Sequence, residues 1–280
     1  MDGTLGAGGH AFGLLKASSP AGQLLGLDVD PQALELATNT LAPFGERIYI
    51  KRASYTTLTS QLSNLGWESV DGILLDLGAS SMQFDNAERG FSFLNDGPLD
   101  MRFDPANQLD ADQVINSWAE DELADLIFRF GEEPASRRIA RAIVNARPIR
   151  STRHLAETIE GIVPRQRSIH PATRTFQALR IMINRELDGI KQFLPMALQS
   201  LASGGCLAII SFHSLEDRLV KEFFRQESRD CLCPPRQPIC TCGHKATIIE
   251  VNHRPITPSQ EEITENKRSR SAKLRIAEKR

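Results

Sequence analysis

The sequence predicts an α/β protein in which a doubly wound, Rossmann-like sheet is interrupted by an all-helical insert. Three short apolar runs, at residues 24–27, 73–75 and 207–212, are typical of buried strands. Continuous apolar runs between helical patterns indicate a parallel sheet covered on both faces. A glycine-rich turn at residues 6–9 precedes the first run. Between the second and third runs every periodic segment has a helical pattern, which predicts the insert.

The elements can be justified in chain order. The first strand ends in acids, and a helix is expected from about residue 31 to residue 41. The second strand ends at Asp76. In the insert, Ser117 followed by Glu120 resembles a capping box, and Gly131 is expected to close the helix that it opens.

Three more helices are expected from the strings "SRRIARAIVNA", "TRHLAETIEGIV" and "PATRTFQALRIMINREL". In the last string, Phe176, Leu179, Ile183 and Leu187 recur at three- and four-residue steps. The third strand returns to the sheet after them. We therefore expect a discontinuous sheet domain, residues 1–103 and 185–280, and a helical insert, residues 104–184.

Length and composition describe an ordinary soluble protein. With 280 residues, 41% of them hydrophobic, the chain can bury one large core or two modest ones. Its longest apolar stretches are too short to cross a bilayer, and no charged leader with a hydrophobic segment precedes the first motif. We expect a cytoplasmic protein with no membrane partner.

Charge is strongly segregated along the chain. Residues 100–133 carry ten acidic and two basic side chains, whereas residues 134–185 carry eleven arginines, two glutamates and no lysine. Arginine without lysine favours bidentate phosphate contacts and stacking on unpaired bases, although arginine runs are also common on solvated helix faces. Seven basic residues and one acid follow in residues 266–280. The predicted RNA contacts are Arg137, Arg138, Arg141, Arg174 and Arg180, with Arg165 and Arg167 beside His170.

The glycine-rich turn predicts a nucleoside cofactor. Gly6, Gly8 and Gly9 allow close backbone approach, and Asp28 follows Gly8 by twenty residues, where an acid at a strand tip can accept both ribose hydroxyls. The alternative is merely a tight turn. Asp76 also ends a strand, and it is expected to accept from an adenine amino group or to face the reacting centre, unless it caps a helix.

Four of the five cysteines fall in the string "CLCPPRQPICTC". Two Cys-x-Cys pairs can wrap one tetrahedral zinc ion, and reduced free thiols are the alternative. Disulfides are least expected in a cytosolic protein. The candidate ligands of a structural zinc are Cys231, Cys233, Cys240 and Cys242.

Seven strings carry a resemblance to a known family: "DGTLGAGGH", "DGILLDLGASS", "ERGFSF", "PLDMRFD", "HPATRTFQALRIMIN", "ISFHSLEDRLVK" and "RSRSAKLR". In this order and through nearly the whole chain, they resemble the MraW family of bacterial small-subunit ribosomal RNA cytosine-N4 methyltransferases. The resemblance implies a class I methyltransferase sheet and an enzyme that uses S-adenosylmethionine to methylate N4 of one cytidine in the decoding region of 16S rRNA. The cofactor residues that it implies are Gly8, Gly9, His10, Asp28 at the ribose, Tyr55 near the adenine, Asp76 and Gln83.

The chain departs from the family pattern in three places. Tyr55 stands where the family usually has Phe, and Met82 stands where it usually has Pro. The family also carries roughly thirty residues before the glycine-rich turn, including a strand in the middle of the sheet. That strand is apparently missing here, so its two neighbours are expected to lose their hydrogen-bond partner, and our hypothesis is that Met1 is a misassigned start or a fragment boundary.

Methylation of a cytosine amino group needs alignment of nitrogen, methyl carbon and sulfur, and an acceptor for the amino hydrogens. The catalytic candidates are Asp100, His213 and Asp76, and His213 is equally compatible with a structural role. The rival functions are a nicotinamide-dependent oxidoreductase, a ribosome-assembly factor without catalysis, and a DNA cytosine-N4 methyltransferase. The sequence leaves the oligomeric state open, with a homodimer as one possibility.

Overall fold

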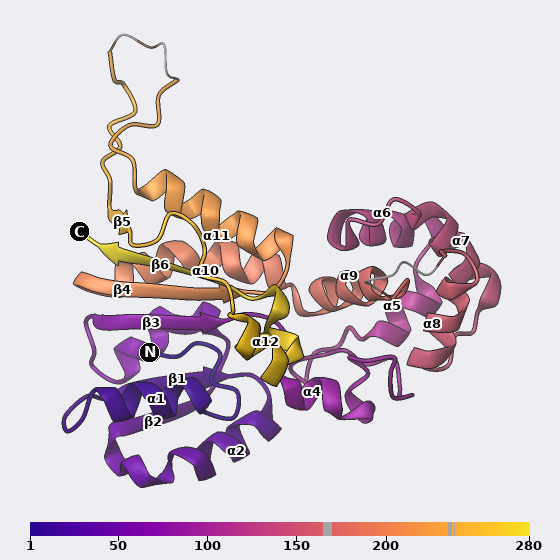
Figure 1. Cartoon of the computed structure of the whole chain (residues 1–280), viewed down its shortest axis with the longest axis horizontal. Helices are drawn as coiled ribbons and strands as arrows, with labels where there is room; N and C mark the ends of the chain where they lie inside the picture. The colour runs from indigo at the N-terminus through magenta and orange to yellow at the C-terminus, as the bar shows by residue number, and fades with distance from the viewer. Residues whose placement is uncertain (165–169, 235–236, 238) are drawn as a thin grey trace. The chain divides into compact units, whose positions relative to one another are not determined.

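The computed structural model describes residues 1–164, 170–234, 237 and 239–280. The chain divides into two compact units, each described here by itself. Unit 1 comprises Met1–Gly78 and Leu187–Arg280, and unit 2 comprises Ala79–Glu186 (Figure 1). Unit 2 therefore begins earlier than the helical insert expected from the sequence. In the described part of the chain, no helix is both long enough and apolar enough to span a bilayer.

Unit 1 contains a mixed sheet. Its strands are β1 (Leu24–Asp28), β2 (Ile48–Arg52), β3 (Val70–Asp76), β4 (Leu201–Ser211), β5 (Ile248–Glu250) and β6 (Lys273–Lys279). β1 pairs with β2, and β3 with β4, in the parallel orientation that the apolar runs predict. β6 runs antiparallel between β4 and β5, so the expectation of an all-parallel sheet is wrong for this part.

The first residues of the chain fill the gap between β1 and β3. The Asp2 N–H donates to Leu25 O at 2.8 Å and the Leu27 N–H donates to Asp2 O at 2.9 Å. On the other side, the Gly3 N–H donates to Leu74 O at 2.9 Å. These contacts are parallel bridges rather than a named strand. The expectation that both neighbouring strands lose their partner is therefore wrong over this length.

Helices cover both faces of the sheet, as predicted for a doubly wound domain. Successive residues Leu24 and Leu25 of β1 point to opposite faces. Leu24 packs in one buried group with Leu15, whereas Leu25 packs in a second group with Phe193 and Phe224. The helices of unit 1 are α1 (Gly9–Ala17), α2 (Pro31–Leu41), η1 (Ala42–Arg47), η2 (Tyr55–Thr57), α3 (Leu58–Asn64), α10 (Glu186–Ser200, in this unit from Leu187), α11 (Ser214–Glu227), α12 (Gln260–Glu265) and η4 (Lys267–Ser271).

Unit 2 is helical in its described residues and has a hydrophobic core of its own, which includes Leu123, Ile139, Leu155 and Leu179. Its helices are α4 (Ser81–Asp85), η3 (Ala87–Arg89), α5 (Ala111–Ser117), α6 (Glu120–Gly131), α7 (Ser136–Ala146), α8 (Thr152–Glu160) and α9 (Thr173–Asn184). α6 contacts both α7 and α9, so it forms the centre of this unit.

The start of α6 corrects the predicted capping box. Ser117 is the last residue of α5, and the N-cap of α6 is Ala119, whose N–H donates to the Glu122 carboxylate at 2.9 Å. α6 does end at Gly131, but Glu132 adopts the left-handed conformation. A Cβ at Gly131 would lie 2.6 Å from the Arg174 carbonyl oxygen. Gly131 is therefore required by the close approach of α6 and α9.

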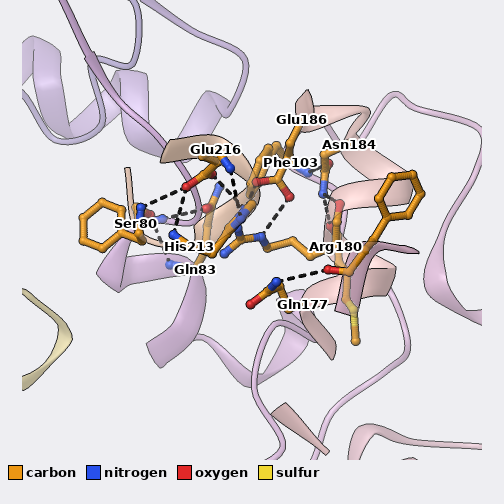
Figure 2. A network of polar contacts seen from close by, with 12 residues as sticks. Ser80, Gln83, Phe103, Gln177, Arg180, Asn184, Glu186, His213 and Glu216 are labelled. Atoms are coloured by element: carbon orange, nitrogen blue, oxygen red, sulfur yellow. Dashed lines mark hydrogen bonds and ion pairs between the residues drawn. The ribbon is translucent and has the colours of Figure 1, made fainter. Parts of the chain in front are cut away.

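Three of the strings that carry the family resemblance meet in unit 2. The Arg89 guanidinium donates to the carbonyl oxygens of Arg102 and Phe103 at 2.9 and 3.1 Å. The Asn184 side chain donates to Met101 O at 2.8 Å and accepts from the Phe103 N–H at 2.7 Å (Figure 2). These strings therefore fix one loop against α9.

The basic segment at the C-terminus forms η4 and the strand β6. The buried Arg275 of β6 donates to Asp217 Oδ1 at 2.7 Å, and Lys273 Nζ lies 3.1 Å from Asp217 Oδ2. Burial alone would raise the pKa of Asp217, but Arg275 and Lys273 hold it below its ordinary value. The two cations therefore attach β6 to α11 and are not free for another partner.

Candidate functional site

The glycine-rich turn leads directly into α1. Gly8, the N-cap of α1, has φ = 88°, which favours glycine, and a Cβ there would lie 3.1 Å from Leu41. A Cβ at Gly9 would meet no atom of the chain within 4 Å. Packing in unit 1 therefore requires glycine at position 8 but not at position 9. The first N–H groups of α1 lack intrahelical acceptors.

Asp28 ends β1 and holds the turn in place. Its Oδ2 accepts the Gly6 N–H at 2.8 Å, and its Oδ1 accepts the Asp30 N–H at 2.9 Å. Asp30 is buried and caps α2 by accepting the Gln32 N–H at 3.0 Å. A carboxylate offers about four lone-pair positions, so Asp28 retains acceptor capacity. Burial raises the pKa of Asp28, and the two N–H donors partly oppose that shift.

Asp76 ends β3, at the same edge of the sheet as Asp28 because parallel strands share a carboxyl edge. Its N–H donates to Thr4 Oγ1 at 2.7 Å, and its Oδ2 lies 3.4 Å from His10 Nε2. Its buried Oδ1 has no hydrogen-bond partner among the described residues. A buried acceptor left unpaired costs about 1–3 kcal/mol. The Asp76 side chain as a whole is partly exposed, so a donor from outside the chain can approach its carboxylate.

Asp2 is a third carboxylate here, which the sequence reasoning missed. It is buried, its Oδ1 accepts the Thr4 N–H at 3.1 Å, and its Oδ2 has no partner in the described part of the chain. Burial raises the pKa of Asp2 to about 6. The only signal in the sequence was its place at the start of the string "DGTLGAGGH".

The charges of this rim favour a cationic ligand with hydrogen-bond donors. Asp2, Asp28 and Asp76 surround the turn, and His10 is half-exposed beside Asp76. The hydrogen bond to Asp76 raises the pKa of His10 above its ordinary value, because the carboxylate stabilises the charged imidazolium. We call the surface formed by residues 2–10, Asp28 and Asp76 the carboxylate rim.

Tyr55 lies in η2 and packs against α10. Its ring meets Phe193 edge to face, with centroids 5.2 Å apart, and a Cβ at Gly189 would lie 2.6 Å from its hydroxyl oxygen. The hydroxyl that distinguishes Tyr55 from the phenylalanine of the family pattern is therefore accommodated by a glycine of α10.

Gln83 and Asp100 belong to unit 2. Gln83 is buried in a capping box at the start of α4, where its Oε1 accepts the Ser80 N–H at 3.0 Å. Met82 therefore lies in a capped helix. Both oxygens of Asp100 pair with the Arg102 guanidinium, at 2.9 and 2.8 Å. Burial alone would raise the pKa of Asp100, but Arg102 holds it below its ordinary value, which makes Asp100 a weak base.

His213 is the N-cap of α11. Its Nδ1 accepts the Glu216 N–H at 3.4 Å, and its Nε2 lies 3.1 Å from Glu216 Oε1. Glu216 in turn accepts the N–H groups of Phe212 and His213. His213 therefore caps α11, while its buried Nε2 has no hydrogen-bond partner among the described residues, so the catalytic and the structural role both stay predictions.

The predicted RNA-binding arginines differ in how exposed they are and in which groups of the chain they already contact. Arg137 and Arg138 are exposed on α7, although Arg138 donates to Ile162 O at 2.9 Å, and the exposed Arg141 pairs with Glu120 at 3.2 Å. Arg174 lies 3.4 Å from Glu133. The largely buried Arg180 forms a bidentate pair with Glu186, at 2.8 and 2.9 Å (Figure 2). Arg165 and Arg167 lie outside the described residues.

The four clustered cysteines of unit 1 come together as predicted from their spacing. Their sulfur atoms all lie within 4.8 Å of one another. Cys206 is exposed in β4 and does not belong to this cluster.

An α/β domain with a glycine-rich turn and acids at two strand tips is typical of proteins that bind a nucleoside-containing ligand at the carboxyl edge of the sheet. The chain belongs to the MraW methylase family, whose model matches residues 1–280.

It is similar to the ribosomal RNA small subunit methyltransferase H of Lawsonia intracellularis, with 50% identity over 287 residues, covering 100% of this chain and 92% of the relative. The protein of the same name from Dehalococcoides mccartyi is 50% identical over 280 residues, covering 100% of this chain and 80% of the relative.

Among solved structures, a putative rRNA methylase from Clostridium thermocellum matches with a TM-score of 0.45 and 11% identity. The match covers 100% of this chain and 87% of that chain, and this level of similarity supports no argument about the site.

Proposed function

We propose that the chain is an S-adenosylmethionine-dependent methyltransferase that acts on N4 of one cytidine in the decoding region of 16S rRNA, within the small ribosomal subunit in the cytoplasm. The observation that carries this proposal is 50% identity, over the whole chain, to relatives named ribosomal RNA small subunit methyltransferase H. Family membership supports the methyl transfer.

The carboxylate rim fits the chemistry of the proposed cofactor. Asp28 retains lone pairs for the ribose hydroxyls, and the free N–H groups at the start of α1 suit the carboxylate of the methionine part. The partly exposed carboxylate of Asp76 suits a ligand with hydrogen-bond donors. The negative charge of the rim favours a sulfonium cation. When bound, the cofactor supplies an activated methyl group.

The residues of the chain then position the cytosine base and accept hydrogen bonds from its amino group. The N4 lone pair of cytosine is delocalised into the ring, so alignment with the methyl group and an acceptor for the amino hydrogens are the main requirements. Of the three catalytic candidates, Asp100 is paired with Arg102 and His213 caps α11. Asp76 ends β3 at the carboxyl edge of the sheet and its side chain is partly exposed, so we assign the acceptor role to Asp76.

Arginines on unit 2 are the proposed contacts with the RNA backbone. Arg137, Arg138 and Arg141 lie on α7, at positions that place them on one side of the helix. The pair between Arg141 and Glu120 is solvent-exposed and is worth at most about 1 kcal/mol, so a phosphate can replace Glu120. Arg174 is half-exposed and joins this set, whereas Arg180 is occupied by Glu186.

The experiment is methylation of small-subunit particles that lack this modification, with S-adenosylmethionine labelled in its methyl group. We expect the label in N4-methylcytidine at a single position of the decoding region. An Asp76→Ala variant, which removes the proposed acceptor, is expected to transfer at least about tenfold less. Label on another atom or another RNA, or wild-type chain that folds and binds the cofactor but transfers nothing, would contradict the proposal.

A further inference from the structure

Four cysteine sulfurs converge in the segment between α11 and β5, which projects beyond these two elements (Figure 1). Cys240 Sγ lies 3.4 Å from Cys231 Sγ, 4.0 Å from Cys233 Sγ and 3.6 Å from Cys242 Sγ. Cys231 Sγ and Cys242 Sγ are 3.8 Å apart. Four thiolates at about 2.3 Å from one tetrahedral zinc ion would be separated by about 3.8 Å. The sulfurs therefore already have the spacing of a zinc site.

Backbone N–H groups point at these sulfurs. The Leu232 N–H donates to Cys242 Sγ at 3.3 Å, and the Thr241 N–H donates to Cys233 Sγ at 3.4 Å. The Cys233 N–H donates to Cys231 Sγ at 3.4 Å. Hydrogen bonds to sulfur stabilise the thiolate, which is the form that binds metal.

Apart from the cysteine cluster, few interactions stabilise the described part of the segment between α11 and β5. Of the described residues between 229 and 247, none is buried. Its base is closed by the Thr247 N–H, which donates to Glu227 O at 2.8 Å, and by the Ala246 N–H, which donates to Asp230 Oδ1 at 3.3 Å. A segment without a hydrophobic core relies on a covalent or metal cross-link for a fixed structure.

We propose that Cys231, Cys233, Cys240 and Cys242 bind one Zn²⁺ ion that fixes the segment between α11 and β5. Four thiolates complete a tetrahedral coordination sphere and leave no open position for water or substrate, so the ion is structural. His244 is not needed as a ligand, because the four thiolates already fill the coordination sphere. This site is separate from the carboxylate rim and does not depend on the proposed methyl transfer.

Metal analysis of the full chain, purified under reducing conditions, tests the proposal. We expect one zinc per chain in the wild type and in Cys206→Ser, which removes the exposed cysteine outside the cluster. Cys240→Ser is expected to lose at least about nine-tenths of the zinc, whereas Cys240→His should retain it, because imidazole is also a zinc ligand. Cobalt in place of zinc should give the intense visible absorption of tetrahedral thiolate coordination.

The wild-type measurement alone can overturn the proposal, whether or not the variants fold. Wild-type chain without stoichiometric metal would contradict it, whether its four thiols are all free or joined in disulfides by mass spectrometry. Stoichiometric iron in place of zinc would contradict the identity of the ion. As a second readout, removal of zinc by a chelator is expected to speed proteolysis between residues 229 and 247 by at least about tenfold. An unchanged cleavage rate would contradict the structural role.

Discussion

At the scale of single residues, Asp2 combines burial with charge. Its folded-state pKa of about 6 lies above the ordinary aspartate value, so the folded chain holds this proton more tightly than the unfolded chain. The contribution of Asp2 to the free energy of unfolding should therefore fall as the pH rises from the ordinary value through 6. The difference between the two pKa values corresponds to a loss on the order of 3 kcal/mol. Urea denaturation across this range measures it.

Asp2→Asn serves as the comparison, because an amide keeps the acceptor for the Thr4 N–H but does not ionise. Its free energy of unfolding should change less with pH in this window than that of the wild type. His10 also has a raised pKa, but its stabilising contribution is present at low pH and is lost above its ordinary value. Parallel pH profiles for Asp2→Asn and the wild type would show that Asp2 is not the group that titrates.

A substitution at Gly9 should affect cofactor binding but not the stability of the fold. Because a Cβ there meets no atom of the chain within 4 Å, Gly9→Val should change the free energy of unfolding by less than about 1 kcal/mol. If the open space belongs to S-adenosylmethionine, the same change should weaken its binding at least about tenfold. Gly13→Val is the matched control, since Gly13 lies on the same helix and is equally open. Equal binding by the two variants would remove Gly9 from the site.

At the scale of secondary-structure elements, Gly131 determines how closely α6 and α9 approach. Gly131→Ala would place a Cβ 2.6 Å from the Arg174 carbonyl oxygen, and the helices must separate to accommodate it. We expect a loss of about 1–3 kcal/mol in the free energy of unfolding. In Gly161→Ala the added Cβ would lie 3.6 Å from Thr158 O, an ordinary van der Waals distance, so chemical denaturation should show a change below about 1 kcal/mol. Equal losses in both variants would contradict this explanation.

Elements with a local signal could be predicted from the sequence, and elements formed by distant pairing could not. Asp30 and Pro31 mark the start of α2, and its predicted range is the observed one. β6 contains charged residues, so it looks like a basic tail. Arg275 is buried only because Asp217, far away in the sequence, neutralises it. No local pattern contains that partner.

In the candidate site, too, residues with a local sequence signal could be predicted, and residues whose role depends on distant partners could not. Asp28 and Asp76 could be placed at one edge because each follows an apolar run and parallel strands share an edge. The roles of Asp100 and His213 depend on hydrogen bonds to Arg102 and to Glu216, which residue type alone does not specify. Asp2 was missed because its burial arises from the two strands on either side of it.

At the scale of the whole molecule, the arginines of α7 should account for part of the affinity for RNA. Each neutralised phosphate makes binding more dependent on salt. We therefore replace Arg137, Arg138 and Arg141 by Gln. The slope of log affinity against log salt should then become less steep, by about 1 for each phosphate that is no longer neutralised. Lys191→Gln, an exposed change on α10 of unit 1, is the control and should leave the slope unchanged. The measurement is RNA binding over a series of salt concentrations, and a slope that is the same in all three chains would exclude α7 from the interface.

The central claim is that the carboxylate rim of unit 1 binds S-adenosylmethionine, and calorimetric titration of the folded chain tests it most directly. We expect one molecule bound per chain, and Asp28→Ala should weaken binding by about 1.5–3 kcal/mol, because it removes a charged acceptor of the ribose hydroxyls. Thermal unfolding of both proteins verifies that they are folded. A folded wild-type chain that takes up no S-adenosylmethionine, or that binds it with the same affinity after Asp28→Ala, would contradict the claim.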